Sequence, residues 1–460
     1  MSRVGRGLLG LAVASAYLVS AGGQPAEAAL AISRPVPTAL PRGANATVHF
    51  YCPEYGQAQA ECAGAIEDQP PRVVVSGPGA HASNARFRYE GPLLDCSPGC
   101  TRPNVVYFDL RLEPGAPVGR RDISVAWANG GTSRCPACFG VLPTHTTFRA
   151  FPMGGNVAVL PMYAPGRHVL VVGAGPGQPP EVRIYTVDEL TAEVRLLRRF
   201  LAYERDFRGG VHVAGGKTRT ANGELWVGAG RGRRPEVRVY DVAANGDVQV
   251  KTSFLAYPSG FGGGVTVAAM AAMGGYVVTG TGAGGGPHVR VWRLRATGGA
   301  AEVAGFFAFS PLSRRGVNVT AGSVCCDGHP NVIVGDGPGA APTVRDFTQH
   351  YDDYTLQEEF TAYGADFRGG VTVAYDQYRL VTGPASHGGP QIREWDLVDN
   401  GDGAGAHWDL AGSYFLYSSR IDQGLSVALA PWAESIAVPR GSIPADVRIR
   451  WYRGALCPFC

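Results

Sequence analysis

Charge is scarce in this sequence of 460 residues, and long apolar segments are almost absent. Only 17% of the residues are charged, and 41 Lys and Arg against 38 Asp and Glu leave a formal net charge of +3. So little charge excludes a coiled coil and a disordered tail, and its near balance argues against a nucleic-acid-binding surface. One apolar run lies near the start, and no segment of the sequence is long enough to be a membrane-spanning candidate.

Glycine and proline, by contrast, are abundant. The 65 Gly and 34 Pro make up about a fifth of the chain, which stays below the roughly 25–30% that marks low-complexity chains. With 45% of the residues hydrophobic, the chain can also bury a core. Many turn-forming residues in a core-forming chain are typical of short strands joined by tight turns. The composition therefore predicts an all-β protein.

The N-terminal segment has the three parts of a secretory signal peptide. Arg3 and Arg6 make its start basic, an apolar run covers residues 8–21, and an Ala-Glu-Ala cleavage site ends at Ala28. The run is too short to span a bilayer. We therefore expect residues 1–28 to be a signal peptide and the mature protein to be secreted and extracellular, with no membrane insertion after cleavage.

The ten cysteines lie in close pairs, which in an exported protein indicates local disulfides. The candidate pairs are Cys52/Cys62, Cys96/Cys100, Cys135/Cys138, Cys325/Cys326 and Cys457/Cys460. Three alternatives stay open: a shared zinc site for the two Cys-x-x-Cys pairs, a crossed disulfide between them, and a redox-active disulfide at the adjacent pair. We favour local structural bridges, or free thiols at the adjacent pair, and expect no metal and no cofactor.

A unit of about 53 residues recurs through the C-terminal two thirds of the chain. Each copy contains a Gly-Val strand start, a valine run ending in glycines, a Pro-x-Val-Arg segment and an aromatic-x-Ala-aromatic segment. Copies of the last segment, some of them weaker, begin at Phe148, Phe200, Phe254, Phe306, Phe360 and Tyr414. Four segments with period-two alternation in each unit predict four strands, as in one blade of a β-propeller.

The phase of the repeat predicts how the propeller closes. The chain enters on a fourth strand at Phe148 and leaves on a third strand at residues 447–451. The segment 146–151 can therefore complete the last blade, which removes the open sheet edges. The Arg that follows Val or Ile occurs six times, at Arg183, Arg238, Arg290, Arg345, Arg393 and Arg448. We predict a six-bladed propeller over residues 144–460, closed by strand exchange between the chain ends.

The blade pattern resembles the FG-GAP or VCBS-type repeats of bacterial secreted proteins, which are related to the integrin α-chain propeller. The matching parts are Phe-Arg-Gly-Gly-Val at 207–211, the Gly-x-Gly-x-Gly runs and the Pro-x-Val-Arg-Val segments, within about residues 146–453. The resemblance implies a propeller used for adhesion, carbohydrate contact or enzyme scaffolding. Members often carry a calcium loop between the first two strands, but the stretch 216–222 here holds Lys and Arg instead of carboxylates, so we expect no calcium there.

Residues 29–143 are predicted to form a small immunoglobulin-like β-sandwich. Strand-like runs begin at Ala46, Arg72, Val105 and Asp122, with Gly and Pro turns between them. The stretch 113–141 resembles the end of bacterial IPT-type immunoglobulin-like domains.

The motifs that usually carry chemistry have structural explanations here. A strand, and no helix, follows each glycine run, so tight loops are expected in place of phosphate-binding loops. The repeated Arg is expected to pack its stem between blades and to place its head on backbone carbonyls or a neighbouring carboxylate. Neither Gly-x-Ser-x-Gly nor His-Glu-x-x-His occurs in the sequence. The sequence therefore favours binding over catalysis.

One face of the propeller is the candidate binding surface. Loops from second to third strands and from fourth to first strands emerge on the same side, which we call the rim. The candidate ligand-binding residues on it are Arg208, Arg231, Arg233, Arg234, His288, Arg315 and Arg368. The rim is also expected to present Arg314, the aromatic residues Tyr203, Tyr257 and Tyr363, and the carboxylates Asp206, Asp336 and Asp366. Positive charge beside aromatic rings fits an anionic glycan.

These features predict a secreted, monomeric binding or adhesion protein whose partner is an extracellular glycan or surface polymer, with a protein partner as a further option. One alternative is a polysaccharide hydrolase or lyase. It would need two carboxylates at catalytic separation, for which Asp206, Asp336 and Asp366 are the candidates. The other alternative is a purely structural envelope protein.

Overall fold

The chain is built from β-strands throughout the part that the structure describes. The computed structural model describes residues 30–31, 35, 37–51, 70–88, 105–128, 130–162, 167–217, 222–270, 275–323, 330–350, 353–376, 379–398, 406–418, 420–430, 432–441 and 445–451. Every element in these residues is a strand, which confirms the all-β prediction. The predicted signal peptide 1–28 lies outside them, as do Cys52, Cys62, Cys96, Cys100, Cys325, Cys326, Cys457 and Cys460.

Two sheets enclose one apolar core in the N-terminal part. One contains β1 (Leu30–Ala31), β2 (Ala39–Pro41), β4 (Arg72–Val75), β7 (Gly119–Ala126) and β8 (Thr132–Leu142), in the order β1-β8-β7-β4 with β2 paired to β8. The other contains β3 (Asn45–Tyr51), β5 (Ala80–Arg88) and β6 (Val105–Leu112), in the order β3-β6-β5. Fully buried Phe50, Phe108 and Phe139 belong to one cluster that joins the two sheets.

The sequence predicted four of these strands and missed two long ones. β3, β4, β6 and β7 match the predicted runs, whereas β5 and β8 were not expected. β5 escapes pattern analysis because Asn84 has a φ of 51° and the pairing with β6 shifts between Ser83 and Arg86, which interrupts the alternation. In β8, Cys135 and Cys138 form a disulfide bond with each other. This is the local pairing that the sequence favoured for them.

Six four-stranded antiparallel sheets make up the described residues from 145 to 451. They are β10 (Gly155–Leu160), β11 (Arg167–Ala174), β12 (Glu181–Asp188) and β13 (Val194–Leu201); β14 (Val211–Lys217), β15 (Gly223–Ala229), β16 (Glu236–Val242) and β17 (Val248–Leu255); β18 (Val265–Ala269), β19 (Tyr276–Thr281), β20 (His288–Leu294) and β21 (Ala300–Phe307); β22 (Val317–Ser323), β23 (Pro330–Asp336), β24 (Thr343–His350) and β25 (Asp353–Thr361); β26 (Val371–Asp376), β27 (Arg379–Pro384), β28 (Gln391–Val398) and β29 (His407–Phe415); and β30 (Leu425–Ala430), β31 (Ala433–Pro439), β32 (Ala445–Trp451) and β9 (His145–Phe151).

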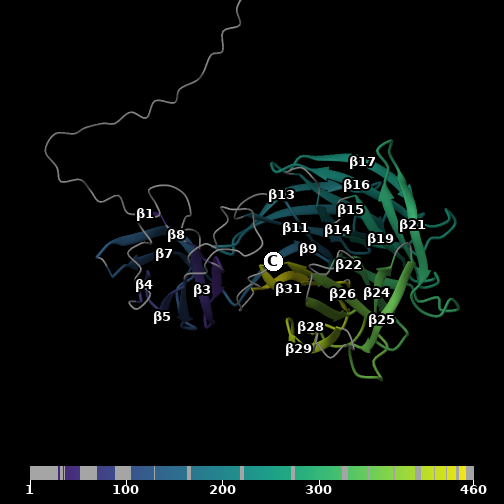
Figure 1. The fold of residues 1–460 in the computed structure, drawn as a ribbon. Coiled ribbons are helices and arrows are strands. Elements are labelled where there is room, and N and C mark those ends of the chain that lie inside the picture. The colour runs from purple at the N-terminus through teal and green to yellow at the C-terminus, as the bar shows by residue number, and fades with distance from the viewer. Residues whose placement is uncertain are drawn as a thin grey trace, which may run out of the picture.

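The sheets form a closed ring. The first strand of each sheet contacts the first strand of the next, and β30 contacts β10. Figure 1 shows the sheets, coloured from blue through green to yellow, around a common centre. This radial repetition of four-stranded sheets is the architecture of β-propellers.

The last sheet joins the two ends of the ring. β9 precedes all the other strands of the ring in sequence, yet it pairs antiparallel with β32, so that Phe148 lies opposite Val447. β9 is therefore the outer strand of the sheet that starts with β30. The predicted strand exchange is present, and it leaves no third strand as an open edge.

Burial falls from the centre of the ring outward. First and second strands such as β18, β15 and β23 are buried along their whole length, because both faces pack against neighbouring sheets. Outer strands such as β13 and β17 alternate half-buried and exposed residues. Continuous apolar runs therefore mark inner strands, and alternating runs mark outer ones.

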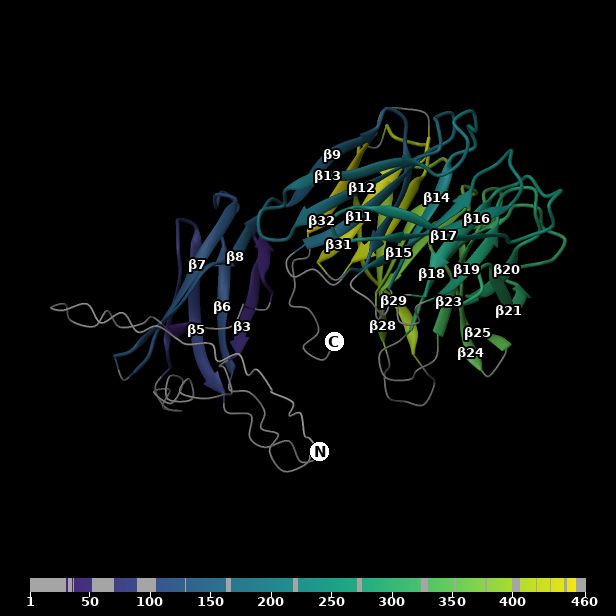
Figure 2. The same ribbon diagram turned by 90° about the horizontal axis from the view of Figure 1, so that it is seen from above.

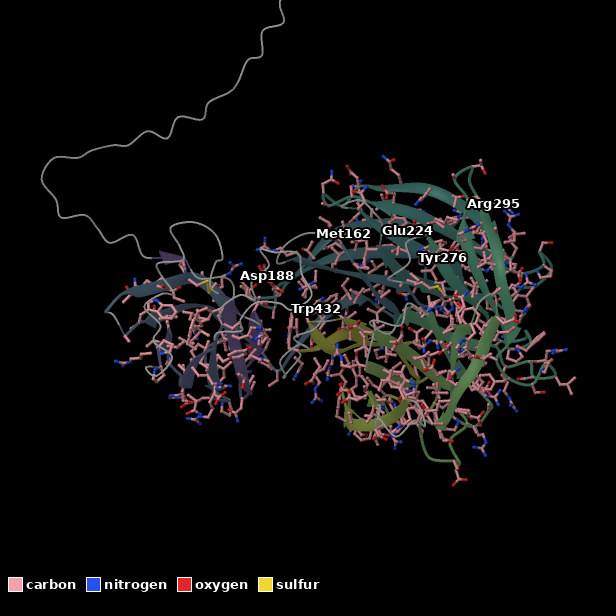
Figure 3. All side chains as sticks on the ribbon, viewed as in Figure 1. Met162, Asp188, Glu224, Tyr276, Arg295 and Trp432 are labelled. Carbon is pink, nitrogen blue, oxygen red and sulfur yellow. A yellow bond between two sulfur atoms is a disulfide. The ribbon has the colours of Figure 1, made fainter. Side chains whose placement is uncertain are left out.

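The N-terminal sheets contact the ring at the turn after β12. Arg120 forms an ion pair with Asp188 at 3.1 Å, and a side chain at Gly140 would collide with the backbone of Leu190. Leu142, at the end of β8, belongs to the same buried cluster as Trp451 of the ring. Figure 2 shows the two-sheet part beside the ring, and Figure 3 labels Asp188 on the side of the ring that faces it.

Candidate functional site

The two kinds of rim loop lie side by side, as the sequence predicted. The backbone N–H of Gly177 donates to the carbonyl of Arg208 at 2.8 Å, and Gly339 N–H donates to Arg368 at 2.7 Å. A Cβ at Gly230 would lie 2.1 Å from the carbonyl oxygen of Gly209. The glycines are therefore required because the backbones of neighbouring loops touch. This agrees with the structural explanation of the glycine runs.

The six repeated arginines hold neighbouring sheets together. Each donates Nη1–H to a carbonyl of the aromatic-x-Ala-aromatic segment: Arg183 to Ala150, Arg238 to Ala202 (2.8 Å), Arg290 to Ala256 (3.2 Å), Arg345 to Ala308 (2.7 Å), Arg393 to Ala362 (2.9 Å) and Arg448 to Leu416. The six guanidinium groups lie 4.5–5.2 Å from the centres of the rings of Phe151, Tyr203, Tyr257, Phe309, Tyr363 and Tyr417. A backbone carbonyl and an aromatic ring contact each cation, so the structural role predicted for these arginines is confirmed.

The rim tyrosines are buried, and the expectation that the rim presents them was wrong. Tyr203, Tyr257 and Tyr363 are 3%, 5% and 8% exposed. The Tyr203 hydroxyl lies 2.8 Å from the carbonyl of Val227, and that of Tyr257 lies 2.8 Å from the carbonyl of His288. These rings serve as platforms for the repeated arginines, so they offer no stacking surface to a sugar.

Arg233, which the sequence placed among the candidate ligand-binding residues, is largely buried and paired with carboxylates. Its side chain is only 17% exposed, pairs with Glu204 and Glu236 and lies 4.8 Å from the centre of the Tyr203 ring. Burial opposes ionisation of Glu236, but hydrogen bonds from Arg238 and Arg233 outweigh it and lower the pKa of Glu236. Arg233 therefore belongs to the packing between two sheets.

The other predicted arginines are exposed on the rim. Arg208 and Arg368 each donate Nη1–H to the carbonyl of the preceding Phe at 3.0 Å, and Arg314 does the same to Ser313. Arg231 and Arg315 have no ion-pair partner among the described residues, whereas Nε of Arg234 lies 3.9 Å from Glu236. The rim thus presents cations at several separate loops.

His288 and Asp336 occupy protected positions. The His288 ring stacks on Phe307 with centroids 4.7 Å apart, and burial together with the charge of Arg290 lowers its pKa. Asp336 is 7% exposed and accepts a hydrogen bond from Gly337 N–H at 2.8 Å, and burial raises its pKa. Asp336 is therefore not a surface carboxylate, whereas Asp206 and Asp366 are exposed.

The described residues show neither a metal-binding cluster nor a membrane-spanning helix. They contain no group of three or more His, Cys, Asp or Glu side chains that could hold a metal ion. No helix among them is long and apolar enough to cross a membrane.

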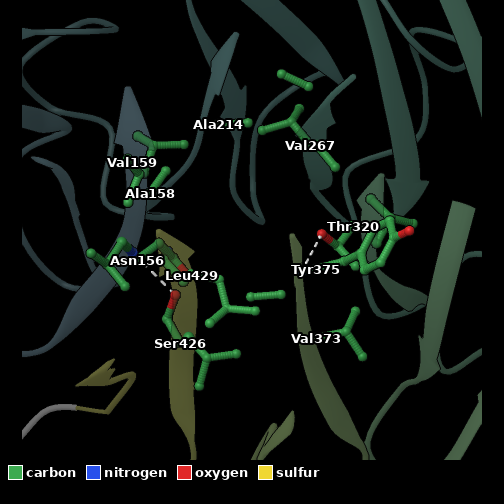
Figure 4. A pocket seen from close by; sticks show the side chains of 18 of the residues that line it. Asn156, Ala158, Val159, Ala214, Val267, Thr320, Val373, Tyr375, Ser426 and Leu429 are labelled. Carbon is green, nitrogen blue, oxygen red and sulfur yellow. Dashed lines mark hydrogen bonds between the residues drawn. The ribbon is translucent and has the colours of Figure 1, made fainter. Parts of the chain in front are cut away.

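A central cavity of about 510 Å³ runs along the first strands of all six sheets, and the sequence predicted none of the residues that line it. Figure 4 shows its lining from close by. At the rim end, each first strand contributes its second residue, and these six polar residues form what we call the mouth ring: Asn156, His212, Thr266, Asn318, Thr372 and Ser426. The next position is valine in every sheet. Aligning the second residues of the repeats would have revealed this ring.

Five residues of the mouth ring connect neighbouring sheets. Asn156 and Asn318 donate Nδ2–H to the first strand of the next sheet at 2.9 and 2.8 Å. Thr266 and Thr372 donate to the equivalent carbonyls at 3.0 and 2.9 Å, and Ser426 accepts from Val157 N–H at 3.1 Å.

The sixth residue, His212, has no hydrogen-bond partner among the described residues. Burial and the nearby charge of Arg440 lower the pKa of His212 to about 3, so its imidazole is neutral at physiological pH.

Arg440 brings a cation into the mouth of the cavity. It follows β31, and its Nη1–H donates to Oδ1 of Asn318 at 3.4 Å. Burial lowers the pKa of Arg440 to about 10, which leaves the guanidinium charged at pH 7. Arg440 comes from the sixth sheet, contacts Asn318 of the fourth and acts on His212 of the second. A group near three alternate members of a six-sheet ring lies close to the ring axis.

No family model matches this chain, and no curated protein matches it. A fungal lectin from Aleuria aurantia, described as a six-bladed β-propeller with a novel mode of fucose recognition, is 11% identical, covers 65% of this chain and 92% of its own, and has a TM-score of 0.39. A protein from Lactobacillus plantarum is 12% identical over 65% of this chain and 93% of its own (TM-score 0.38). Sqt1 from Saccharomyces cerevisiae is 7% identical over 63% of this chain and 81% of its own (TM-score 0.36). The propeller architecture rests on the sheet topology above, and the likeness to FG-GAP or VCBS repeats stays a prediction.

Proposed function

We propose that this protein is a secreted extracellular binding or adhesion protein whose rim binds an anionic glycan or another anionic surface polymer. In this proposal the six sheets are the six blades of one FG-GAP/VCBS-type propeller, and the two N-terminal sheets are an immunoglobulin-like module. The cyclic contacts between first strands and the exchange of β9 support the blade count. The basic and apolar segments before Ala28 support secretion.

The observation that carries the proposal is the uneven charge of the rim. The loop 230–235 contains three arginines and the loop 308–316 contains two, with no acidic residue in either. Arg231, Arg314 and Arg315 are exposed, and none forms an ion pair with another described residue. By contrast, the loops 202–210 and 362–370 hold as many acidic as basic residues.

The spread of these cations favours a polymer over a small ligand. They stand on separate loops of one face and do not converge on a single pocket, so one small anion could not contact them all. A chain that carries repeated carboxylates or other acidic groups can reach several of them at once, and each contact is a charge-assisted hydrogen bond.

The test removes three rim charges and compares them with three charges elsewhere. In one variant Arg231, Arg314 and Arg315 become Ser. In the control, Arg149, Arg195 and Arg198, which are exposed on the outer strands β9 and β13, become Ser, so that the net charge is the same. Retention on immobilised polygalacturonate should fall by at least about tenfold in the rim variant only. Binding of the unchanged protein should weaken as salt shortens the Debye length to about 3 Å.

Three results would contradict the proposal. Equal losses of retention in the rim variant and the control variant would show that only the net charge of the protein matters for binding. No retention on any anionic polymer would favour a structural envelope role. Release of new reducing ends from the polymer would favour the hydrolase or lyase alternative.

A further inference from the structure

The central cavity has a polar, cationic entrance and an apolar interior. Below the mouth ring lie six valines: Val157, Val213, Val267, Val319, Val373 and Val427. Next come five alanines and Thr320, whose hydroxyl accepts a hydrogen bond from Tyr375 N–H at 3.1 Å. Of the described lining residues, only Asp376 has a carboxylate. It lies at the far end of the first strands, 3.6 Å from Arg379.

Arg440 is a guanidinium with unused hydrogen-bonding capacity. The side chain has five N–H donors, yet the described residues provide it with one acceptor, the amide oxygen of Asn318 at 3.4 Å. It has no ion pair with a described residue, in contrast to Arg238 and Arg450, which pair with Glu236 and Glu434. A planar guanidinium in this state is suited to a carboxylate, which it binds through two parallel hydrogen bonds.

The charge balance of the mouth favours a singly charged anion. His212 is neutral and can donate one N–H, so Arg440 is the one cation among the described lining residues. A monocarboxylate would neutralise this charge. A doubly charged phosphate would leave an excess negative charge in a partly desolvated site, which is unfavourable.

The lining below the mouth favours an apolar tail over a sugar. Five mouth-ring residues already direct a polar group to a neighbouring sheet, and the Thr320 hydroxyl accepts from Tyr375 N–H. Below the mouth, the hydroxyls of a sugar acid would face the valine and alanine side chains and would lose hydrogen bonds to water. The valine and alanine layers instead gain from contact with methylene groups.

We infer that the mouth of the central cavity is a binding site for a small monocarboxylate with an apolar tail, whose carboxylate pairs with Arg440 and accepts from His212 while the tail lies among the valines. Arg440 stands on a rim loop, between β31 and β32, but it lines the cavity, whereas Arg231, Arg314 and Arg315 do not. Binding in the cavity therefore does not depend on whether these three arginines bind a polymer.

The test is calorimetric titration of the full-length protein with butyrate, hexanoate and octanoate. Octanoate should bind at one site, and each pair of methylenes removed should weaken binding about tenfold. Octanol and octylamine, which keep the tail but lack the carboxylate, should bind at least about tenfold more weakly than octanoate. Arg440→Gln should weaken octanoate binding by at least about tenfold, Arg440→Lys should have an intermediate effect, and the rim control Arg231→Gln should have none.

Each opposite result overturns the inference. Octanoate binding that survives Arg440→Gln would place the site elsewhere. Glucuronate or inorganic phosphate binding more tightly than octanoate, with dependence on Arg440, would replace the apolar-tailed ligand by a sugar acid or a phosphate. Arg440→Gln should leave retention on polygalacturonate unchanged, so failure of one proposal is distinguishable from failure of the other. If that variant does not fold, Arg440→Lys with the same probes decides the question.

Discussion

Arginines occupy two kinds of position in the ring, and their surroundings differ sharply. Between the sheets, six arginines each have a carbonyl acceptor and an aromatic ring, and Arg238 also has a carboxylate at 2.9 Å. At the mouth of the central cavity, the Arg440 side chain has a single acceptor among the described residues, at 3.4 Å. Each of the six sheets must solve the same packing problem, so the residues that solve it are repeated. Arg440 has no equivalent in the other sheets.

The same contrast exists inside the mouth ring. Five of its residues connect neighbouring sheets, whereas His212 connects none among the described residues. His212 is also the residue whose pKa responds to Arg440. In a repeat protein, a position that departs from the shared structural role is therefore the place to look for a ligand.

The largest expected effect comes from removing the closing strand together with the carbonyl and the aromatic ring that contact one repeated arginine. A fragment 152–460 lacks β9, so β32 becomes an open edge and Arg183 loses both the Ala150 carbonyl and the Phe151 ring. It should aggregate, whereas 144–460, which keeps β9, should melt cooperatively and remain soluble. Thermal melts and size-exclusion chromatography of both fragments measure this. A soluble, cooperatively melting 152–460 would refute closure by β9.

A smaller but still large effect is expected at one repeated arginine. Arg238→Met keeps the stem but removes the head, which leaves the Ala202 carbonyl with the Tyr240 hydroxyl as its remaining side-chain donor and Glu236 with one cation fewer. The free energy of unfolding should fall by about 2–3 kcal/mol, while Arg440→Met should change it by less than about 0.5 kcal/mol. Urea denaturation of the two variants compares them directly. Equal losses of unfolding free energy in the two variants would show that the arginines between the sheets stabilise the fold no more than Arg440 does.

Arg233 and Arg231 allow a comparison, within one loop, of a paired and largely buried arginine with an exposed one. Arg233→Ser leaves Glu204 without its nearest cation and removes one of the two guanidinium groups over the Tyr203 ring, so it should destabilise the protein by about 1–2 kcal/mol. Arg231→Ser, at an exposed position, should stay within about 0.5 kcal/mol. Melting temperatures of the two single variants separate them, and a harmless Arg233→Ser would mean that its ion pairs contribute nothing.

The smallest effect concerns acid stability at His212. Its pKa is about 3 in the folded protein and near 6.5 when unfolded. Between these values the unfolded state binds a proton that the folded state does not, so stability falls as pH decreases from about 6.5 toward 3. His212→Asn removes this titration and supplies an amide that can donate to Val265, as Asn156 does to Val211.

Melts at pH 7 and pH 4 should therefore show a loss of stability on acidification that is smaller in His212→Asn than in the unchanged protein. Asn156→His, made at an equivalent position, should enlarge the loss. An unchanged pH dependence in both variants would show that the mouth ring does not contribute to acid sensitivity.

Sequence analysis predicted more of the ring than of the N-terminal sheets. In the ring, each strand is seen six times, so irregularities in one copy do not hide the pattern. In the N-terminal part β5 occurs once, and the break at Asn84 was enough to conceal it. Among site residues, the sequence placed Arg208 and Arg368 on the rim beside the glycine loops, but it also placed there Tyr203 and Arg233, which are buried or paired.

The sequence by itself determined the all-β architecture, the four strands of each unit, the pairing of β9 with β32 and the structural role of the repeated arginines. The all-β architecture follows from the composition, and the other three follow from the period and phase of the repeat. These are properties of the linear sequence, which need no knowledge of contacts. Only the tertiary structure decided which arginines find partners and which side chains reach the axis. His212 and Arg440 are distant in sequence and act on each other only because the ring closes, and burial at that point removes the water that would otherwise screen them.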